Sequence, residues 1–441
     1  MSVHRLSLVL LLALVAAAFA NALGVTFLLD DIGDVTGNPS AAAATFFDRL
    51  PITNRPLTKA SYAFNDLAHG AHAMGYAAVN LGLHLAAAAL AFLLVRRAFA
   101  RAASSSAAPL ALAVCAIWAV HPALTESVTY ISGRSMVFSA VLMLGALLAA
   151  TADRPRPAIA FLCAILAPLA RETALVLPLM LLWWRFTIGR PALQWPVWLG
   201  VLLAAAVVAL MPHHRDLVAF SLDMRTPLLA LRDNLHAATE ILGFWFTPWR
   251  VTIFPEPPPP HAWIDPATLI RLLGFLAAAV VAIVLRHRAP VAAFGIGLAL
   301  LALAPSNTII WRTDPVALKP LYLAGLGLSL IAIDVLRRFA RPRAVLAIAA
   351  ALALALGMQT HLRNTLFRSD LALFADAAEK TPDNPDALIA YGGALVAAQR
   401  YDEAEATLDR ALDLAPQDER AMNLLQLLAT IRSVERRGGA P

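Results

Sequence analysis

The stretch LSLVLLLALVAAAFANALGVTFLLDD, residues 6–31, is apolar through residue 29 apart from three polar residues, and it ends in two aspartates. At about 1.5 Å per residue, an apolar helix of this length crosses a hydrocarbon core of roughly 30 Å. The segment therefore predicts a transmembrane helix. Asp30 and Asp31 stand at its mouth, where a carboxylate pair costs desolvation free energy unless water, a cation or a partner meets it. An ordinary solvated loop start is the alternative explanation.

The composition extends this prediction to most of the chain. Hydrophobic residues make up 60% of the 441 residues and charged residues 15%, and the mean hydropathy is +0.68. Apolar blocks alternate with short charged hinges, which is the pattern of a polytopic all-α membrane protein. The net charge of +6 is spread over these hinges and does not indicate nucleic-acid binding. Cys115 and Cys163 lie inside apolar blocks, so no disulfide framework is indicated.

The N-terminal segment allows two interpretations. A basic start, an apolar run and the tripeptide AFA at residues 18–20 resemble a cleavable secretory signal. The apolar run continues to Leu29, however, which is longer than is typical of a signal, and cleavage would remove the helix that positions Asp30. We favour an uncleaved anchor.

Basic residues at the hinges predict the orientation, because Lys and Arg are enriched in cytoplasmic loops. With a cytoplasmic N-terminus, about 11 spans in the inner (plasma) membrane place every basic cluster on the cytoplasmic side. The predicted spans are 6–29, 76–95, 108–121, 135–152, 157–170, 173–187, 195–211, 267–285, 290–305, 321–336 and 344–360. The basic clusters are Arg96, Arg97 and Arg101; Arg154 and Arg156; Arg185 and Arg190; Arg286 and Arg288; and Arg337, Arg338, Arg341 and Arg343.

The segment 226–250 is ambiguous. Its first half carries Arg232, Asp233 and His236, and its second half is rich in aromatic residues. A charged, aromatic, amphipathic stretch favours a helix in the outer membrane interface over a spanning one, although the sequence leaves both open.

The C-terminal part differs in character. From residue 364 the chain becomes polar, and residues 385–418 fit a tetratricopeptide repeat of about 34 residues, with small residues where the two helices would cross. A plain helical hairpin is the alternative. We predict a transmembrane domain over 1–360 and an extracytoplasmic tetratricopeptide tail over 361–441. Because about three repeats are needed for independent stability, the tail should dock on the membrane domain or on a protein partner.

Charged side chains gather in the predicted outer loops. A carboxylate can take a proton from a hydroxyl, and arginine binds phosphate through a planar fork. Carboxylates with a histidine can also hold a divalent cation such as Mg²⁺ or Mn²⁺. Together these groups suit transfer of a sugar from a lipid phosphate, although each one alone is more often an interface anchor. The group consists of Asp30, Asp31, Glu126, Glu172, Arg55, Arg134, Arg171 and His121, with Asp31, His121 and Glu126 as candidate metal ligands.

Several ordered landmarks resemble those of the transmembrane-and-tetratricopeptide family of O-mannosyltransferases. They are NALGVTFLLDD (21–31), NRPLTKASYAFNDLAHGAHAMGYAAVNLGLHL (54–85), WAVHPALTESVTYISGR (118–134), ARETAL (170–175), LAPSNTII (303–310) and RNTLFRSDLALFADAAEKTPDN (363–384). Such proteins belong to the polytopic GT-C glycosyltransferases, which use polyprenyl-phosphate sugars on the extracytoplasmic side. High Ala and Leu content with few Lys is typical of a bacterial member.

The resemblance implies roles for particular residues. The first outer carboxylate, Asp30, would be the base towards the acceptor hydroxyl, with Asp31 beside it. The His-Pro…Thr-Glu and Gly-Arg landmarks fall on residues 121–126 and 133–134, and Arg-Glu-Thr falls on 171–173. The family's Ala-Glu-Arg-Tyr-Leu-Tyr run is replaced here by Ala-Leu-Lys-Pro-Leu-Tyr over residues 317–322, which lacks the acid.

These observations define two hypotheses. The first is an integral-membrane glycosyltransferase that moves a mannose-like sugar from a polyprenyl-phosphate carrier to an extracytoplasmic protein or glycan hydroxyl. In it, Asp30, Asp31 and Glu126 are catalytic, Arg55, Arg134 and Arg171 bind the donor phosphate, and His121 and Glu172 support them. The second is a non-catalytic membrane scaffold that recruits partners through the tetratricopeptide tail. A scaffold needs no cluster of outer charges, so the cluster favours the enzyme.

Overall fold

The computed structural model describes residues 3–50, 53–102, 106–189, 194–256, 265–307 and 315–438, and within these ranges it is helical with no strand. The all-α prediction is therefore confirmed. The α-helices are α1 (Val3–Phe19), α2 (Phe46–Arg49), α3 (Pro56–His69), α4 (Ala73–Arg101), α5 (Ala107–Ala119), α6 (Thr125–Val128), α7 (Arg134–Ala150), α8 (Pro157–Ala170), α9 (Leu177–Thr187), α10 (Trp195–Leu210), α11 (Pro212–Met224), α12 (Pro227–Phe246), α13 (Pro266–Leu285), α14 (Pro290–Leu303), α15 (Leu321–Phe339), α16 (Pro342–Asn364), α17 (Asp370–Lys380), α18 (Pro385–Ala397), α19 (Tyr401–Leu414) and α20 (Glu419–Gly438). Short 3₁₀ or π turns are η1 (Ala20–Gly24), η2 (Ile32–Thr36), η4 (Pro122–Leu124), η5 (Ile131–Gly133), η6 (Glu172–Val176), η7 (Pro248–Arg250) and η8 (Thr365–Arg368).

Each predicted span coincides with an apolar helix. By length and composition, five of the described helical segments could cross a membrane, or up to seven if each of two bent pairs is one span. The five are Val3–Gly24, Ala73–Arg101, Ile131–Ala150, Pro266–Leu285 and Pro342–Arg368, and the bent pairs are α5 with Pro122–Val128 and α10 with α11. Helices α8 and α14 have 14 residues each, fewer than the about 20 that cross a bilayer core, so the figure of about 11 spans stays a prediction.

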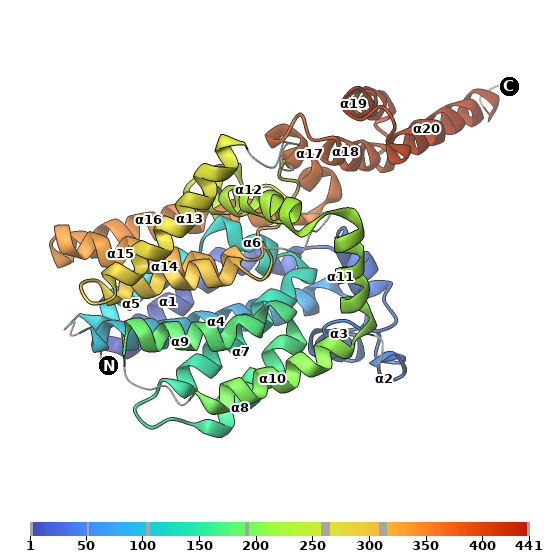
Figure 1. Cartoon of the computed structure of the whole chain (residues 1–441). Coiled ribbons are helices and arrows are strands. Elements are labelled where there is room, and N and C mark those ends of the chain that lie inside the picture. Colours follow the sequence, from blue (N-terminus) through green and yellow to red (C-terminus); the bar gives the residue numbers. More distant parts are fainter. Residues whose placement is uncertain are drawn as a thin grey trace.

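The bundle has two chemically different ends. The helices run across Figure 1, with the N-terminus at one end and α2, α3 and α11 at the other. At the N-terminal end the basic hinges contact one another: Arg101 donates to the Gly189 carbonyl (3.4 Å) and Arg338 to the Arg288 carbonyl (3.1 Å). The predicted clustering of basic residues on one side is thus a geometric feature of the bundle, with Arg190 lying outside the described residues.

Helix α12 covers most of the ambiguous segment. Arg232, Asp233 and His236 in its first half are buried inside the protein, whereas Phe246 and Trp249 at its far end are largely exposed. These polar residues therefore face protein. The aromatic residues divide, because Phe244 and Trp245 are buried and only Phe246 and Trp249 face outward.

The tail follows the repeat pattern. Helices α18 and α19 form the predicted hairpin, and a Cβ on Gly392 would lie 2.6 Å from a methyl carbon of Leu408, so a small residue is required where the helices cross. The predicted domain boundary at 360 falls inside α16, and the tail leaves the bundle near its outer corner (Figure 1).

Close packing of α14 on α15 rests on a pair of facing glycines. A Cβ on Gly295 would lie 2.6 Å from the Gly327 carbonyl oxygen. Small residues allow apolar helices to approach closely, which supplies van der Waals contact in place of a hydrophobic driving force.

We therefore expect Gly295→Val to destabilise the bundle by about 1–3 kcal/mol, because overpacking forces the two helices apart. The measurement is thermal unfolding of the full chain in detergent. Gly274→Val is the matched control, since a Cβ there meets no atom within 4 Å. Equal unfolding temperatures for the two variants would contradict the role of the glycine contact.

Candidate functional site

The two aspartates after α1 have different environments. Asp31 is buried, and its carboxylate accepts hydrogen bonds from the amides of Leu28 (3.1 Å) and Ser132 (2.7 Å). Asp30 is exposed, and its backbone amide donates to the Tyr130 hydroxyl (2.7 Å). Asp31 therefore joins the first loop to η5, and this contact leaves the Asp30 carboxylate directed outside the protein core.

Burial raises the pKa of Asp31 from 3.8 to about 7. The two amide hydrogen bonds and Lys319 oppose this effect, while the neighbouring Asp30 carboxylate adds to it. Asp31 thus changes its charge near neutral pH.

Lys319 and Glu126 lie beside the aspartates. Glu126, at the first turn of α6, accepts a hydrogen bond from the Leu318 amide (3.0 Å) just before α15. The Lys319 Nζ lies 5.7 Å from the centre of the Tyr130 ring. Within the described part of the chain no carboxylate lies within ion-pair distance of this Nζ.

Burial lowers the pKa of Lys319, and the attraction of Glu126 and Asp30 opposes that shift. Arg171 and Arg55 repel the ammonium and lower its pKa further. These interactions bring both signs of charge together around one point, at the end of the bundle opposite the N-terminus.

Arg55 and Glu172 are paired with each other. The Arg55 guanidinium donates two hydrogen bonds to the Glu172 carboxylate (2.8 and 2.7 Å). Burial alone would raise the pKa of Glu172, but Arg55 and then Arg171 hold it well below its usual range. Arg171 is itself buried and donates to the Ser135 hydroxyl (2.9 Å). This group adjoins the cluster around Lys319 and fixes the α3 and α8 ends.

Arg134 lies inside the protein rather than at the open cluster. It is 0% exposed and donates to Asn80 Oδ1 (2.7 Å), the Ser61 carbonyl (3.1 Å) and the Tyr76 carbonyl (2.9 Å). Its guanidinium also lies over the Tyr62 ring, 4.4 Å from the centroid. From the first turn of α7 the side chain turns inward and joins α3, α4 and α7. The sequence predicted that Arg134 binds the donor phosphate, whereas in the structure its guanidinium is bonded inside the protein.

His121 is also committed to the fold. Its ring stacks on Trp245 with centroids 3.8 Å apart, and Nε2 contacts the Trp245 carbonyl (3.0 Å). The Ala123 amide donates to Nδ1 (3.2 Å), which assigns the proton to Nε2. Both ring nitrogens are therefore used.

The residues do not fit a divalent cation held by protein side chains. Each oxygen of Asp31 accepts an amide hydrogen bond, and both nitrogens of His121 are engaged. Among the described residues no group of three or more His, Cys, Asp or Glu side chains is placed to hold a metal ion.

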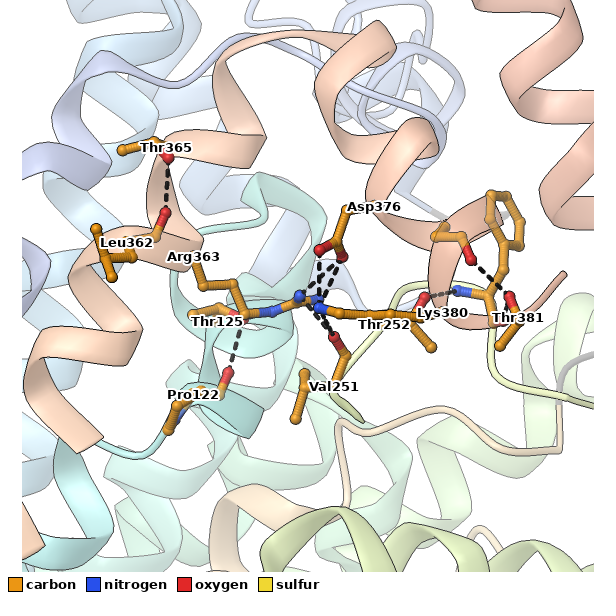
Figure 2. A network of polar contacts seen from close by, with 12 residues as sticks. Pro122, Thr125, Val251, Thr252, Leu362, Arg363, Thr365, Asp376, Lys380 and Thr381 are labelled. Carbon is orange, nitrogen blue, oxygen red and sulfur yellow. Dashed lines mark hydrogen bonds and ion pairs between the residues drawn. The ribbon is translucent and has the colours of Figure 1, made fainter. Parts of the chain in front are cut away.

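The tail reaches the same region through Arg363. Its guanidinium donates to the Thr125 hydroxyl (3.1 Å) and the Val251 carbonyl (2.7 Å), and it pairs with Asp376 of α17 (3.4 Å), as Figure 2 shows. Thr125 directly precedes Glu126. The first tail helix is thus joined to the turn that carries a candidate catalytic carboxylate.

Further tail side chains hold the segment 251–255. Lys380 donates to the Val251 carbonyl (3.0 Å) and Thr381 to the Phe254 carbonyl (3.1 Å), the first of these at the centre of Figure 2. Asn384 donates to the carbonyls of Phe254 (3.2 Å) and Pro255 (3.0 Å). The tail therefore packs against the segment that follows α12 and η7, so it contacts the helical bundle.

Sequence reasoning missed three members of the site: Lys319, Tyr130 and Arg363. Lys319 had a signal, because it occupies the stretch where the chain departs from the family landmark. Tyr130 and Arg363 lie inside the quoted landmarks 118–134 and 363–384, but no pattern there indicated their contacts, because their partners lie far away in the sequence.

Comparison with known proteins agrees with this architecture. A tetratricopeptide repeat family matches residues 371–428, which confirms the repeat prediction. Protein O-mannosyl-transferase TMTC3 of Mus musculus is 32% identical over 160 residues, covering 33% of this chain and 17% of the mouse protein. Protein O-mannosyl-transferase Tmtc3 of Drosophila melanogaster is 37% identical over 108 residues, or 21% of this chain and 12% of that protein. The human TMTC3 is 29% identical over 168 residues, or 35% of this chain and 18% of the human protein.

The matches thus span less than a fifth of each of these relatives. No solved structure matches the chain. The chain is an all-helical protein with apolar helices and a tetratricopeptide region, and it is similar to part of proteins named as O-mannosyl-transferases.

The raised pKa of Asp31 predicts a pH-dependent stability. The folded state binds the proton more tightly than the unfolded state, so stability falls as pH rises from about 4 to about 7. Asp31→Asn removes this ionisation while keeping one hydrogen-bond acceptor. We expect the unfolding temperature of this variant to change less between about pH 5 and about pH 8 than that of wild type. Asp48→Asn, an exposed control, should keep the wild-type slope; an unchanged slope in Asp31→Asn would contradict the assignment.

Proposed function

We propose that the chain is a membrane glycosyltransferase. It moves a mannose-like sugar from a polyprenyl-phosphate carrier to a hydroxyl of an extracytoplasmic protein or glycan. The observation that carries this proposal is the cluster at the outer end of an apolar bundle, where the exposed carboxylate of Asp30 lies near the cation of Lys319. The similarity to proteins named as O-mannosyl-transferases supports it.

The cluster suits both halves of such a transfer. Asp30 takes the proton of the acceptor hydroxyl while the hydroxyl oxygen forms a bond to the anomeric carbon of the sugar. The bond between that carbon and the phosphate oxygen breaks, and its electron pair stays on the polyprenyl phosphate. Lys319 and Arg171 stabilise the negative charge that develops there.

The other residues position these groups. Asp31 and Tyr130 hold the loop that carries Asp30, and Glu126 holds the turn that carries Lys319. Arg55 with Glu172 braces the neighbouring helix ends. We assign Arg134 and His121 to the framework, because their polar atoms bond to protein groups.

The orientation is part of the proposal. An inner-membrane protein with a cytoplasmic N-terminus has its basic hinges in the cytoplasm. The cluster and the tetratricopeptide tail then lie outside, where a lipid-linked sugar and an acceptor meet. The tail is the place for a protein partner.

Replacing the proposed base tests the enzyme hypothesis. Asp30→Asn keeps size and polarity but cannot accept the hydroxyl proton, so sugar transfer should fall by about two to four orders of magnitude. The assay is turnover of the purified chain with synthetic polyprenyl-phosphate sugars. Asp48→Asn, in the same outer loop, should keep wild-type turnover.

Near-normal turnover of Asp30→Asn would move the base to Asp31 or Glu126. Normal turnover of all three Asn or Gln variants would defeat the catalytic interpretation of the cluster. Wild-type protein that is inactive with every donor would favour the scaffold.

The phosphate role of Lys319 has a separate test. Losing a charge-assisted hydrogen bond costs about 1.5–3 kcal/mol, so Lys319→Ala should raise the donor KM by about tenfold or more. Lys319→Arg keeps the cation and should recover part of the loss. An unchanged donor KM in Lys319→Ala would remove Lys319 from the phosphate site.

A further inference from the structure

A groove lies at the opposite end of the bundle, between α9, α13 and α14. Its volume is about 890 Å³, and its walls are mostly apolar, with Leu182, Ala279 and Leu300 among the lining residues. Helix α13 covers it from outside, and only 11% of the apolar window of that helix is buried. Leu300 also lines the next apolar cavity, of about 420 Å³, on the other side of α13. Apolar cavities therefore lie on both sides of α13.

The inner wall of the groove is rigid. The Trp183 indole nitrogen donates to the Ala293 carbonyl (3.1 Å), and the ring packs directly on Gly297. Any side chain at Gly297 would collide with the indole. The packing of α9 on α14 therefore fixes the shape of this wall of the groove.

Positive charge lines one end of the groove. Arg185 lies in the last turn of α9, and Arg286 directly follows α13. The Arg286 guanidinium lies 4.1 Å from the centre of the Phe186 ring. Arg286 Nε donates to the neighbouring His287 ring (2.9 Å). Among the residues that the structure describes, neither arginine has a carboxylate partner. Two guanidinium groups at the mouth of an apolar groove offer planar donors that suit a phosphate.

We propose that this groove binds one anionic glycerophospholipid of the leaflet at the basic end of the bundle. The phosphate lies between Arg185 and Arg286, which offer planar donors suited to it. The acyl chains lie along the apolar walls under α13. Basic pockets between membrane helices on the cytoplasmic side are known to suit anionic headgroups. A zwitterionic lipid carries its own cation and leaves the two arginines uncompensated.

The site is separate from the proposed glycosyl transfer. It lies at the end opposite Asp30, and its expected effect is to hold the loosely packed α13 against α9 and α14. Ligand bound to the folded state raises stability by mass action. Failure of the lipid test would therefore leave the glycosyltransferase proposal unchanged, and the reverse also holds.

The test uses the full chain in a neutral detergent after lipid removal. Native mass spectrometry and thermal unfolding follow titration with dioleoyl phosphatidylglycerol and, in parallel, dioleoyl phosphatidylcholine. Wild type should bind one phosphatidylglycerol about tenfold or more tightly than phosphatidylcholine, with a matching rise in unfolding temperature.

Three variants separate the headgroup from the groove. Arg185→Ala combined with Arg286→Ala should lose the preference for phosphatidylglycerol. Arg341→Ala combined with Arg343→Ala removes the same charge from exposed positions at the same end and should keep it. Ala279→Trp keeps the charges but fills the groove, so it should weaken binding of both lipids.

Several results would overturn the proposal. A preference that survives loss of Arg185 and Arg286, or that is lost equally in the Arg341 and Arg343 control, would show attraction to surface charge alone. Full-strength binding to Ala279→Trp would show that the chains do not enter the groove. If the double variant does not fold, Arg185→Gln and Arg286→Gln are tested singly, and each should lose part of the preference.

Discussion

The buried carboxylate of Asp31 is the contact on which the candidate site depends. It accepts hydrogen bonds from the amides of Leu28 and Ser132, and these bonds hold the loop after the first helix against the turn before α7. In a low-dielectric interior an unpaired carboxylate would be costly, so both amides are needed for it to stay there. Because Asp31 is held in this way, the next carboxylate, Asp30, remains open beside Tyr130. The exposed position of the proposed base follows from the burial of its neighbour.

The need to pair buried polar groups also determines the contacts of other residues in the bundle. Polar groups within apolar helices must find partners inside the protein. Arg134 meets this requirement by joining three helices, and His121 by stacking on Trp245 and bonding its carbonyl. These contacts hold the helix ends that surround the cluster. Residues that look catalytic in the sequence therefore divide into a buried framework and a small open group.

The tail adds a constraint at the end of the bundle that carries the candidate cluster. Arg363 bonds to the turn before Glu126, to the 251–255 segment and to α17, so the tail cannot shift without disturbing that turn. A short repeat array lacks the core to be stable alone, and this docking supplies the missing contacts. An acceptor or partner bound by the tail would lie at a fixed position relative to the cluster.

The sequence by itself determined the helical class, the positions of most helices, the repeat hairpin and the gathering of basic residues at one end. These features follow from local composition and periodicity, which act within one helix or hinge. It also predicted that Asp30, Asp31, Glu126 and the arginines Arg55, Arg134 and Arg171 form one group. Only the tertiary structure decided which of them are open. Adjacent aspartates differ because Ser132, distant in sequence, donates to one of them, and Arg134 turns inward because Asn80 and Tyr76 lie behind it. Lys319 joins the site because the turn before α15 packs on Glu126. Burial and pairing depend on groups that are far apart in the sequence and are brought together by packing. A local sequence pattern does not show which of these groups meet.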